Sequence, residues 1–392
     1  PELREKAALK LKEAHEEGYS PVAVVSAMGR VGAPYATDTL ISLAKAEYEH
    51  LDSRNLDILM ATGEIISTVV MTQTIRKLGL KAVAVTGWQA GIITDDHFGD
   101  ASIKRVDCTK IIQYLEKGYI VVVAGFQGAT EDGEITTLGR GGSDTSAVIL
   151  GVALEAEYVD IFTDVIGVMT ADPRIVPEAH ILEGLTYTEA AEIIQQGAKV
   201  IHDKAMNIAR EYRVPLRVRS LNDGGKGTLI CDIRSMSKEG LRLFSQDKPV
   251  YSIAFRKGLA QFRVKLNGKK DNLRMFQLLA NKGISIDLIN LFPDTVAFVV
   301  EEGKAPKVKE ILDQEGFELT LIHPCAKISL VGSGMADRPG VVADMVEALR
   351  DSHVEILQTS DSHVTISCLV HATDMEKAIQ VLHRKFQLED IC

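Results

Sequence analysis

Short apolar runs rich in β-branched residues alternate with longer amphipathic segments from the start of the chain to about Arg219. The runs typical of strands cover residues 22–26, 81–86, 120–124, 158–162 and 215–219. Helical patterns lie between them, as at 56–78 and 188–196. Continuously apolar strands joined by helical crossovers are typical of a mostly parallel sheet with helices on both faces. We therefore expect a three-layer α/β domain over residues 1–220, whose ligands lie beyond the carboxyl ends of the strands.

The rest of the chain repeats a smaller pattern after a polar, turn-rich linker at 221–248. The order strand, helix, strand, strand, helix occurs twice, with an offset of about 70 residues between the copies. Helical patterns fall at 271–282, 305–312, 341–351 and 375–386. We expect two small α+β units of the ferredoxin-like kind, at 249–325 and 326–392, whose strands are free to interleave. Two such copies beside an enzyme-like domain favour a sensor module, and a role in dimerisation alone is the alternative.

Composition narrows the class of protein. The chain has 392 residues, of which 46% are hydrophobic and 25% charged, and its net charge is −10. This acidic balance argues against a nucleic-acid partner or an anionic membrane surface, and no apolar run reaches membrane-spanning length. Five scattered cysteines and the absence of a signal-peptide pattern predict reduced thiols in a cytoplasmic protein. No Cys/His spacing indicates a metal site.

The segment at 136–147, Thr-Thr-Leu-Gly-Arg-Gly-Gly-Ser-Asp-Thr-Ser-Ala, follows the apolar run 119–126 and leads into an apolar helical pattern. Its glycines permit positive φ and a close approach of the backbone to a ligand. Arg140 offers a fork of donors suited to a carboxylate or phosphate. Ser143 and Asp144 are candidate caps of the following helix, whose positive end favours an anion. We predict an anion-binding loop at the edge of the sheet, and a tight turn with a helix cap is the alternative.

Further charged residues in the first domain suit phosphoryl transfer. The cations are Arg140, Arg174 and Lys199, and the carboxylates are Glu64, Asp144 and Asp164. Phosphoryl transfer depends mainly on positioning and on neutralising negative charge. A carboxylate acceptor is already ionised at neutral pH, so it needs no general base. Taken singly, each of these residues is more often an ion-pair partner or a solvated surface residue.

In combination, these motifs resemble those of aspartate kinases, which belong to the amino acid kinase superfamily. The signatures, in the family's order, are residues 139–147, 163–165, 170–174 and 197–200. The duplicated second half is similar to a tandem pair of ACT domains, so the resemblance covers essentially the whole chain. Through residues 125–130 and 358–363 the resemblance is nearest to the diaminopimelate-sensitive class.

The resemblance implies a reaction and its regulation. ATP and L-aspartate would give 4-phospho-L-aspartate and ADP, with Mg²⁺, as the first step of lysine, threonine, methionine and diaminopimelate biosynthesis. Diaminopimelate, lysine or threonine would act as a feedback effector through the ACT units, near Asn272 and Asp287. The resemblance also implies a homodimer formed through those units.

The same resemblance implies roles for the candidate residues of the first domain. Arg140 would bind the α-carboxylate of aspartate, Asp144 and Glu64 would bind its amino group, and Ser26 would lie near the reacting groups. On the nucleotide side, the residues would be Thr163 and Asp164, with Arg174 and Lys199 against the phosphates.

One departure from the family concerns its first strand, which carries Lys-Phe-Gly-Gly-(Thr/Ser)-Ser and places a lysine at the transferred phosphoryl group. The sequence begins at Pro1, after the point where that strand would end. We therefore expect either a further segment in the natural protein or a chain without this cation and with little activity. Two alternatives stay open. One is another kinase of the superfamily, acting on glutamate, carbamate or a nucleotide, and the other is a non-catalytic amino-acid-sensing subunit.

Overall fold

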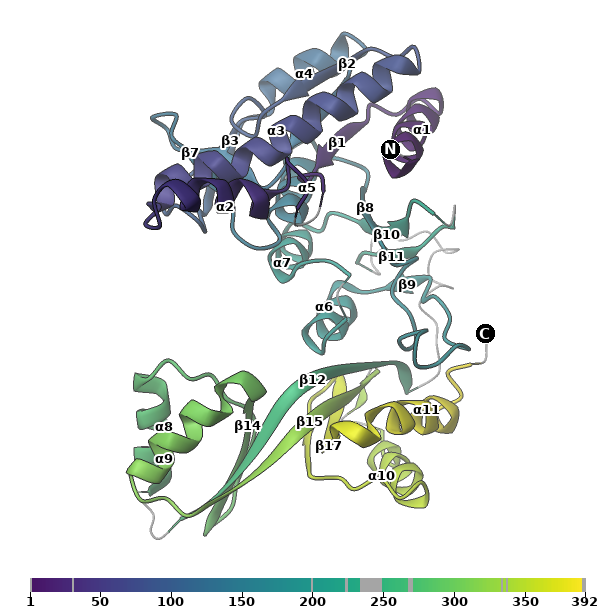
Figure 1. Cartoon of the computed structure of the whole chain (residues 1–392). Helices are drawn as coiled ribbons and strands as arrows, with labels where there is room; N and C mark the ends of the chain where they lie inside the picture. Colours follow the sequence, from purple (N-terminus) through teal and green to yellow (C-terminus); the bar gives the residue numbers. More distant parts are fainter. Residues whose placement is uncertain are drawn as a thin grey trace. The chain divides into compact units, whose positions relative to one another are not determined.

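The computed structural model describes residues 2–389 apart from 30–31, 199, 223–224, 233–248, 267–270, 333 and 336–337, and it forms two compact units (Figure 1). The first unit comprises Pro1–Val168, Glu183–Ala191 and Lys199–Leu241. The second comprises Met169–Leu182, Glu192–Ala198 and Arg242–Cys392. Two short segments of the first half of the chain, Met169–Leu182 and Glu192–Ala198, therefore belong to the second unit. Most of the predicted linker at 221–248 lies outside the described residues.

A parallel three-stranded sheet forms the centre of the first unit. Its order is β1 (Val22–Val25), β5 (Ile120–Ala124) and β2 (Ala82–Val85). All five residues of β5 are buried, because helices cover both faces. Ile120 and Val122 pack in one apolar cluster with Ile75, while Val121 and Val123 pack in another with Leu150. This alternation confirms the predicted three-layer arrangement.

The helices of residues 1–220 have the following bounds. They are α1 (Glu2–Glu16), α2 (Thr37–Glu47), α3 (Ser53–Lys77), α4 (Thr109–Glu116), α5 (Gly142–Ala153), α6 (Tyr187–Gln195) and α7 (Asp203–Tyr212). By length and apolar composition, α3 is the one described helix that could cross a membrane. However, its Met71 and Ile75 are buried against the sheet in a cluster with Ala8 of α1, as in the core helix of a globular domain.

The first unit also contains two smaller sheets. Two of their strands were predicted, at 158–162 and 215–219, and the others were not. One sheet has the order β4 (Ile103–Val106), β3 (Ile92–Thr94), β6 (Gln127–Ala129), β7 (Ile135–Thr137). The other has the order β8 (Val159–Thr163), β10 (Leu216–Ser220), β11 (Thr228–Ile230), β9 (Gly184–Leu185). In the latter, β8 and β10 are parallel, and Ser220 lies opposite Thr163. The carboxyl ends of these two strands therefore share one edge of the sheet.

The second unit is built on a six-stranded antiparallel sheet. Its order is β13 (Asp287–Leu291), β14 (Thr295–Glu301), β12 (Val250–Lys265), β15 (Leu319–Gly332), β17 (Thr365–His371), β16 (Gln358–Asp361). The long strands β12 and β15 pair from Val250 opposite Gly332 to Val264 opposite Leu319. They therefore run through both of the predicted repeats and join them into one sheet.

Each repeat keeps its own apolar core beside the shared sheet. The helices are α8 (Asp271–Asn281) and α9 (Ala305–Gln314) in the first repeat, and α10 (Val341–Asp351) and α11 (Met375–Lys385) in the second. Phe262 and Phe298 stack at 5.3 Å between ring centroids in the first core. In the second core, Met345 of α10 and Ile379 of α11 pack on Ile328 of β15. The predicted order of strands and helices is present in both copies.

Candidate functional site

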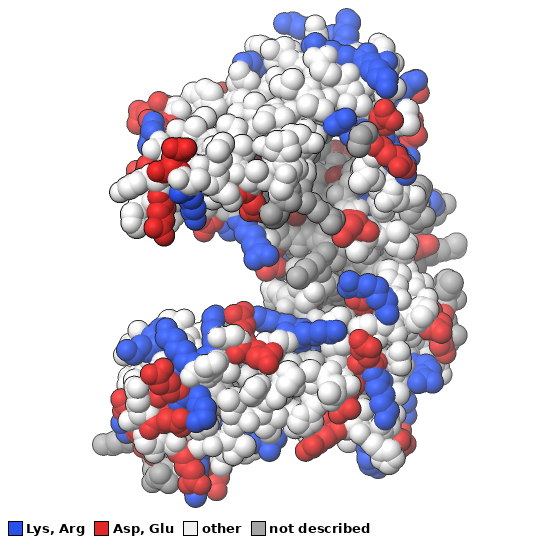
Figure 2. All heavy atoms as spheres, viewed as in Figure 1, with Lys and Arg blue, Asp and Glu red and all other residues white. Residues whose placement is uncertain are grey.

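Charge alone does not mark a site on the face of the protein that Figure 2 shows. In Figure 2, acidic and basic side chains are interspersed over the visible face of each unit. The backbone is more informative, because several segments converge where β1 and β5 end. Since ligands of open α/β sheets bind at the carboxyl ends of the strands, the candidate site is built from this edge outward.

The glycine-rich loop before α5 adopts a conformation that side chains would obstruct. Gly139 and Gly141 have φ values of 72° and 74°. A Cβ atom at Gly141 would lie 2.0 Å from the ring of His202, and one at Gly142 would lie 2.7 Å from the ring of Phe126. Gly141 is itself the N-cap of α5, with no side-chain cap. The prediction that Ser143 and Asp144 cap this helix is therefore wrong, because a left-handed glycine already turns the chain into it.

Arg140 leaves the loop toward solvent. Its side chain is exposed, and it makes no hydrogen bond or ion pair with any residue that the structure describes. An arginine held at the start of a helix with all its donors unused is suited to a planar carboxylate or phosphate. The loop therefore presents a free guanidinium beside the positive end of α5.

Asp144, in the first turn of α5, is fixed from the start of α7. One carboxylate oxygen accepts a hydrogen bond from the backbone amide of His202 at 3.2 Å. Burial raises the pKa of Asp144 above its ordinary value. The adjoining Lys204 contacts the carboxylate of Asp100 and donates to the carbonyl oxygen of Leu138 at 3.2 Å. The beginning of α7 therefore holds the loop from Leu138 to Asp144 in place.

Glu64 reaches the same edge from α3 and is almost fully buried, with 5% of its surface exposed. One carboxylate oxygen accepts a hydrogen bond from the amide of Ala27 at 3.0 Å. The other has no hydrogen-bond partner among the described residues. Burial raises the pKa of Glu64 to about 7. A Cβ atom at Gly63 would lie 2.9 Å from that of Ala27, so the glycine lets α3 approach closely.

The start of α5 lies over the ends of β1 and β5. Ser26 directly follows β1 and is exposed. Gly125 follows β5, and a Cβ atom there would lie 3.1 Å from the side chain of Ser143. The next residue, Phe126, has a φ of 68° and donates its amide to the hydroxyl of Ser146 at 3.0 Å. Left-handed backbone at a bulky residue is uncommon and concentrates at functional sites. The residues after β1, the start of α5 and Glu64 therefore converge at the carboxyl ends of β1 and β5.

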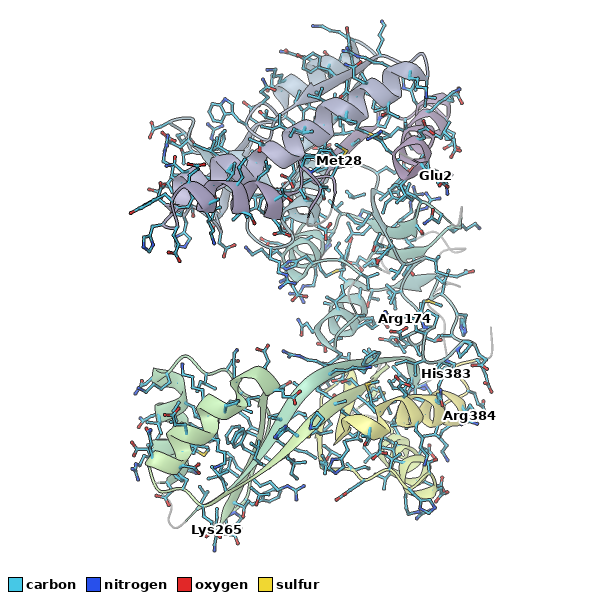
Figure 3. The ribbon with its side chains drawn as sticks, viewed as in Figure 1. Glu2, Met28, Arg174, Lys265, His383 and Arg384 are labelled. Atoms are coloured by element: carbon cyan, nitrogen blue, oxygen red, sulfur yellow. The ribbon has the colours of Figure 1, made fainter. Side chains whose placement is uncertain are left out.

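The predicted nucleotide residues fall into two groups. Thr163 ends β8, and its hydroxyl donates to the carboxylate of Asp164 at 3.0 Å. Arg174 belongs to the second unit and projects into solvent, its side chain 86% exposed and paired at 2.6 Å with Asp172 (Figure 3). This guanidinium holds the pKa of Asp172 below its ordinary value. Lys199 lies outside the described residues.

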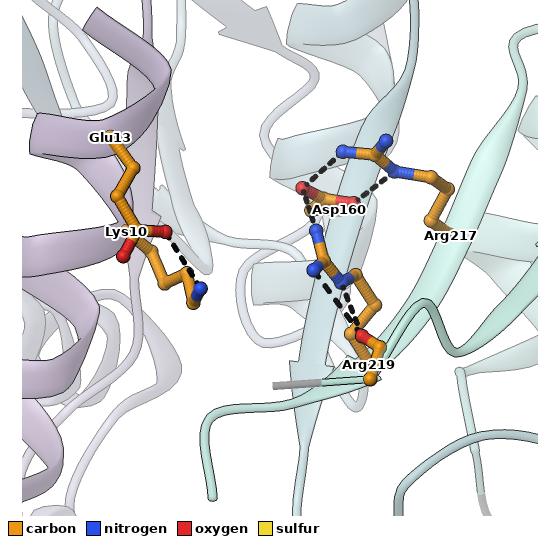
Figure 4. A network of polar contacts seen from close by, with 6 residues as sticks. Lys10, Glu13, Asp160, Arg217 and Arg219 are labelled. Carbon is orange, nitrogen blue, oxygen red and sulfur yellow. Dashed lines mark hydrogen bonds and ion pairs between the residues drawn. The ribbon is translucent and has the colours of Figure 1, made fainter. Parts of the chain in front are cut away.

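The strand that ends at Thr163 is fixed by a cluster of charges on the sheet. Asp160 of β8 accepts from Arg217 of β10 at 2.7 and 2.8 Å and from Arg219 at 3.5 Å (Figure 4). The guanidinium of Arg217 also lies 3.4 Å from the ring centroid of Tyr158. Bidentate and stacked arginine contacts are geometrically specific, so they fix the register of β8 against β10.

The predicted effector residues lie at two places in the first repeat. Asn272 is in the first turn of α8, and Asp287 begins β13 and pairs with Lys327 at 3.1 Å. Neither lines the cavity of about 670 Å³ that opens within this unit. The residues around that cavity include Arg263, Asn290, Phe292, Asp294, Leu357 and Gln358. Gln358 and Thr359 belong to the segment 358–363 noted in the sequence, but no sequence pattern predicted the cavity, because its walls come from both repeats.

The cavity wall carries a buried polar network. The amide group of Gln358 donates to the carbonyl oxygens of Leu288 and Ala297. Gln261 donates to the side-chain oxygen of Gln358 at 2.8 Å, and Arg263 donates to the carbonyl of Leu357 at 3.1 Å. Satisfied buried networks of this kind fix one arrangement of the chain. They therefore hold the two repeats in register around the cavity.

Both halves of the chain match known protein families. Residues 2–220 match the amino acid kinase family, and residues 321–384 match the ACT domain. The chain is 45% identical over 380 residues to aspartokinase 1 of Bacillus subtilis (strain 168), covering 96% of this chain and 93% of that protein. Two solved structures of E. coli aspartokinase III are 27% identical and cover 89% of this chain and 79% of theirs. One holds aspartate and ADP and gives a TM-score of 0.69, and the other holds lysine and aspartate and gives 0.70.

Proposed function

Because this chain belongs to the aspartokinases, within the amino acid kinase family, we propose that its first unit transfers the γ-phosphoryl group of ATP to the side-chain carboxylate of L-aspartate at the edge of β1 and β5. The observation that supports this site most directly is the convergence there of a free cation, Arg140, with two carboxylates, the half-buried Asp144 and the buried Glu64. An α-amino acid carries one carboxylate and one ammonium group, which is the complement of this set.

The carboxylates are suited to the ammonium group of aspartate. The unsatisfied oxygen of Glu64 is an acceptor in a buried place, where an unpaired carboxylate is unfavourable. An ammonium group nearby would favour the ionised form and lower the pKa of Glu64 from about 7. Arg140 would meanwhile bind the α-carboxylate in a forked geometry. The substrate would then be held at both charged groups, leaving its side-chain carboxylate to react.

The proposed reaction requires no covalent bond to the protein. The attacking carboxylate of aspartate is ionised at neutral pH, so no residue has to remove a proton. The bond from the γ-phosphorus to the bridging oxygen of ADP breaks as the bond to the carboxylate oxygen forms. Ser26 lies at the strand end, where it would orient the reacting groups. The chain's task is to position the two anions and neutralise their charge.

On the nucleotide side we propose Thr163 and Asp164 as contacts of ATP, with Arg174 and Lys199 against the phosphates. Thr163 ends β8 at the edge shared with β10 and Asp164 follows it, while Arg174 is exposed and pairs with Asp172. Among the described residues no group of three His, Cys, Asp or Glu could hold a metal ion. Mg²⁺ commonly takes phosphate oxygens, waters and only one or two carboxylates, so it would enter with the nucleotide.

The second unit would take an amino-acid effector, since one of the similar E. coli structures holds lysine. Asn272 lies at the amino end of α8, where a carboxylate is favoured. Asp287 offers a carboxylate to an ammonium group in exchange for Lys327. We propose diaminopimelate, lysine or threonine as the ligand, and a homodimer formed through this unit.

The acceptor is tested by measuring ADP release from ATP and Mg²⁺ with L-aspartate, L-glutamate or carbamate in turn. We expect release that depends on aspartate and is absent with the other two. Release that depends on glutamate or carbamate would assign the chain to a different acceptor. Calorimetry with the three effectors, and size measurement with and without them, tests the regulatory part separately.

A further inference from the structure

The loop that carries Arg174 is built into the second unit rather than the first. Residues Met169–Leu182 form part of that unit's compact body. Three apolar side chains of the loop, Ala171, Ile175 and Val176, are buried in the core of the second repeat together with Ile379 of α11. Removing this much apolar surface from water anchors the loop firmly to the repeat. Its conformation therefore depends on a helix some 200 positions further along the chain, as the 205-residue separation of one of its contacts shows.

Polar contacts fix the loop at its start and at its middle. The hydroxyl of Thr170 lies 3.1 Å from Nε2 of His383, and both residues are buried, at 2% and 0% exposure. The carbonyl of Thr170 accepts from the amide of Ile253 at 2.8 Å. One turn before His383 on α11, Gln380 donates to the carbonyl of Ile175 at 3.0 Å. One face of α11 therefore holds both ends of the segment 170–175.

The opposite side of this segment presents its cation. The side chain of Arg174 is 86% exposed and pairs with Asp172, which also accepts from the amide of Arg174 at 2.9 Å. Figure 3 shows Arg174 and His383 in the same unit, on neighbouring segments. The loop is thus clamped on its inner side and charged on its outer side.

The segment before Lys199 is held on the same sheet. The side-chain oxygen of Gln196 accepts from the hydroxyl of Ser329 in β15 at 2.8 Å. A Cβ atom at Gly197 would lie 2.2 Å from the carbonyl oxygen of Phe255 in β12, so only glycine permits this approach. Both segments that lead to the proposed phosphate-binding cations therefore rest on strands or helices of the second unit.

From these contacts we infer that His383 is a positioning residue for nucleotide binding. It holds Thr170 and, through it, the loop that presents Arg174. The inference rests on the proposed role of Arg174 at the phosphates. It assigns to a buried histidine of the regulatory half a role in substrate binding that its sequence surroundings do not suggest.

The test removes the contact without changing the shape of either side chain more than necessary. Thr170→Val deletes the hydroxyl isosterically, His383→Leu deletes the ring nitrogens, and His383→Gln places an amide near the position of Nε2. We expect the KM for ATP and the calorimetric Kd for ADP to rise about fivefold to tenfold in His383→Leu, since its hydrogen bond to Thr170 is lost. In Thr170→Val the rise should be at least as large, because the Thr170 hydroxyl also accepts from the amide of His180 at 3.2 Å. The KM for aspartate should stay within about twofold, and His383→Gln should restore most of the affinity.

Thr365→Val is the matched control. Thr365 is a buried threonine of β17 in the same repeat, and its hydroxyl bonds to that of Ser362 instead of to the loop. We expect unchanged KM and Kd values in this variant. If His383→Leu does not fold, the isosteric Thr170→Val variant carries the test alone.

Two results distinguish this inference from the proposed role of Arg174 at the phosphates, on which it rests. If Arg174→Ala weakens ADP binding while Thr170→Val and His383→Leu leave it unchanged, the positioning role is wrong and the phosphate role stands. If Arg174→Ala leaves ADP binding unchanged, the phosphate role itself fails. A parallel rise of KM for both substrates, with a lower melting temperature, would also overturn the inference, because it indicates a merely structural contact.

Discussion

Glu64 of α3 accepts a hydrogen bond from the amide of Ala27, directly after the end of β1, and is left with one buried oxygen that has no partner among the described residues. This contact joins the helix to the strand end at which Ser26 lies. It also explains how a carboxylate is held at the site without an ion pair of its own. An acceptor held in this way would be completed by a ligand with an ammonium group, as we propose for aspartate.

The pH dependence of stability follows from the same group. Because the pKa of Glu64 is raised to about 7, the folded protein holds this proton more tightly than the unfolded chain does. The contribution of this proton to stability is complete below pH 4.5, the ordinary pKa of glutamate, and is lost as the pH rises through about 7. As the pH rises between these two values, the free energy of unfolding of Glu64→Gln should gain up to about 3 kcal/mol relative to that of the natural protein. Urea unfolding of both proteins at pH 5 and pH 8 tests this, and a difference independent of pH would contradict it.

Aspartate affinity should follow the ionisation of Glu64. The ionised form attracts the ammonium group, so the KM for aspartate should fall as pH rises from 6 to 8. In Glu64→Gln the KM should be raised about tenfold or more at pH 8 and should vary little with pH, because the charge is gone. Steady-state kinetics at saturating ATP measures both. A KM that keeps its pH dependence in the variant would assign that dependence to another group.

Arg140→Ala should abolish the use of aspartate while leaving the Kd for ADP within about twofold, because the arginine is proposed to bind the acceptor alone. Arg54→Ala is the matched control, since Arg54 is an exposed arginine of the same unit paired with Glu134. This control should behave as the natural protein, apart from a loss of stability below about 1 kcal/mol. Equal loss of aspartate use and ADP binding in Arg140→Ala would remove the role given to it.

Gly141 should tolerate no side chain. Alanine there would be strained at a φ of 74° and would overlap the ring of His202, which donates its amide to Asp144. We expect Gly141→Ala to lose about 1 kcal/mol to strain and a further 1 to 3 kcal/mol to the overlap, and to lose activity. Gly133→Ala isolates the strain, because Gly133 has a φ of 86° and open space around it. Equal stability of the two variants by urea unfolding would show that the ring does not constrain the loop.

The effector site can be located with two neighbouring aspartates. Asp287→Asn should raise the effector concentration for half-inhibition about tenfold, through loss of the charge that meets its ammonium group, without changing either KM. Asp294→Asn removes a carboxylate at the cavity instead. If inhibition assays show the loss only for Asp294→Asn, the effector binds in the cavity and the assignment to Asp287 is wrong.

The central layers of the fold could be predicted because their signal is local. The apolar run at 120–124 is buried on both faces, and the structure gives β5 the same limits. The helical pattern at 56–78 begins three residues earlier, because Asp52 accepts from the amide of Asn55 as its N-cap. Such agreement is expected where periodicity and burial report the same thing.

Other features depend on contacts that no local pattern records. The loop at 169–182 belongs to the second unit because of its packing on α11, and Thr170 and His383 are 213 positions apart. The cap of α5 was misjudged because a left-handed Gly141 outweighs the usual preference for Ser or Asp at that position. The glycines and charged residues of the candidate site could be proposed from the sequence, but the close approaches between their segments could not.

The central claim is that the first unit makes an acyl phosphate of aspartate. The most direct measurement is the formation of aspartyl hydroxamate by the full chain with ATP, Mg²⁺, L-aspartate and hydroxylamine, since hydroxylamine traps the product itself. We predict hydroxamate that requires both ATP and aspartate and that disappears in Arg140→Ala. Binding of an effector without any hydroxamate, or hydroxamate formed from glutamate and not from aspartate, would contradict the account.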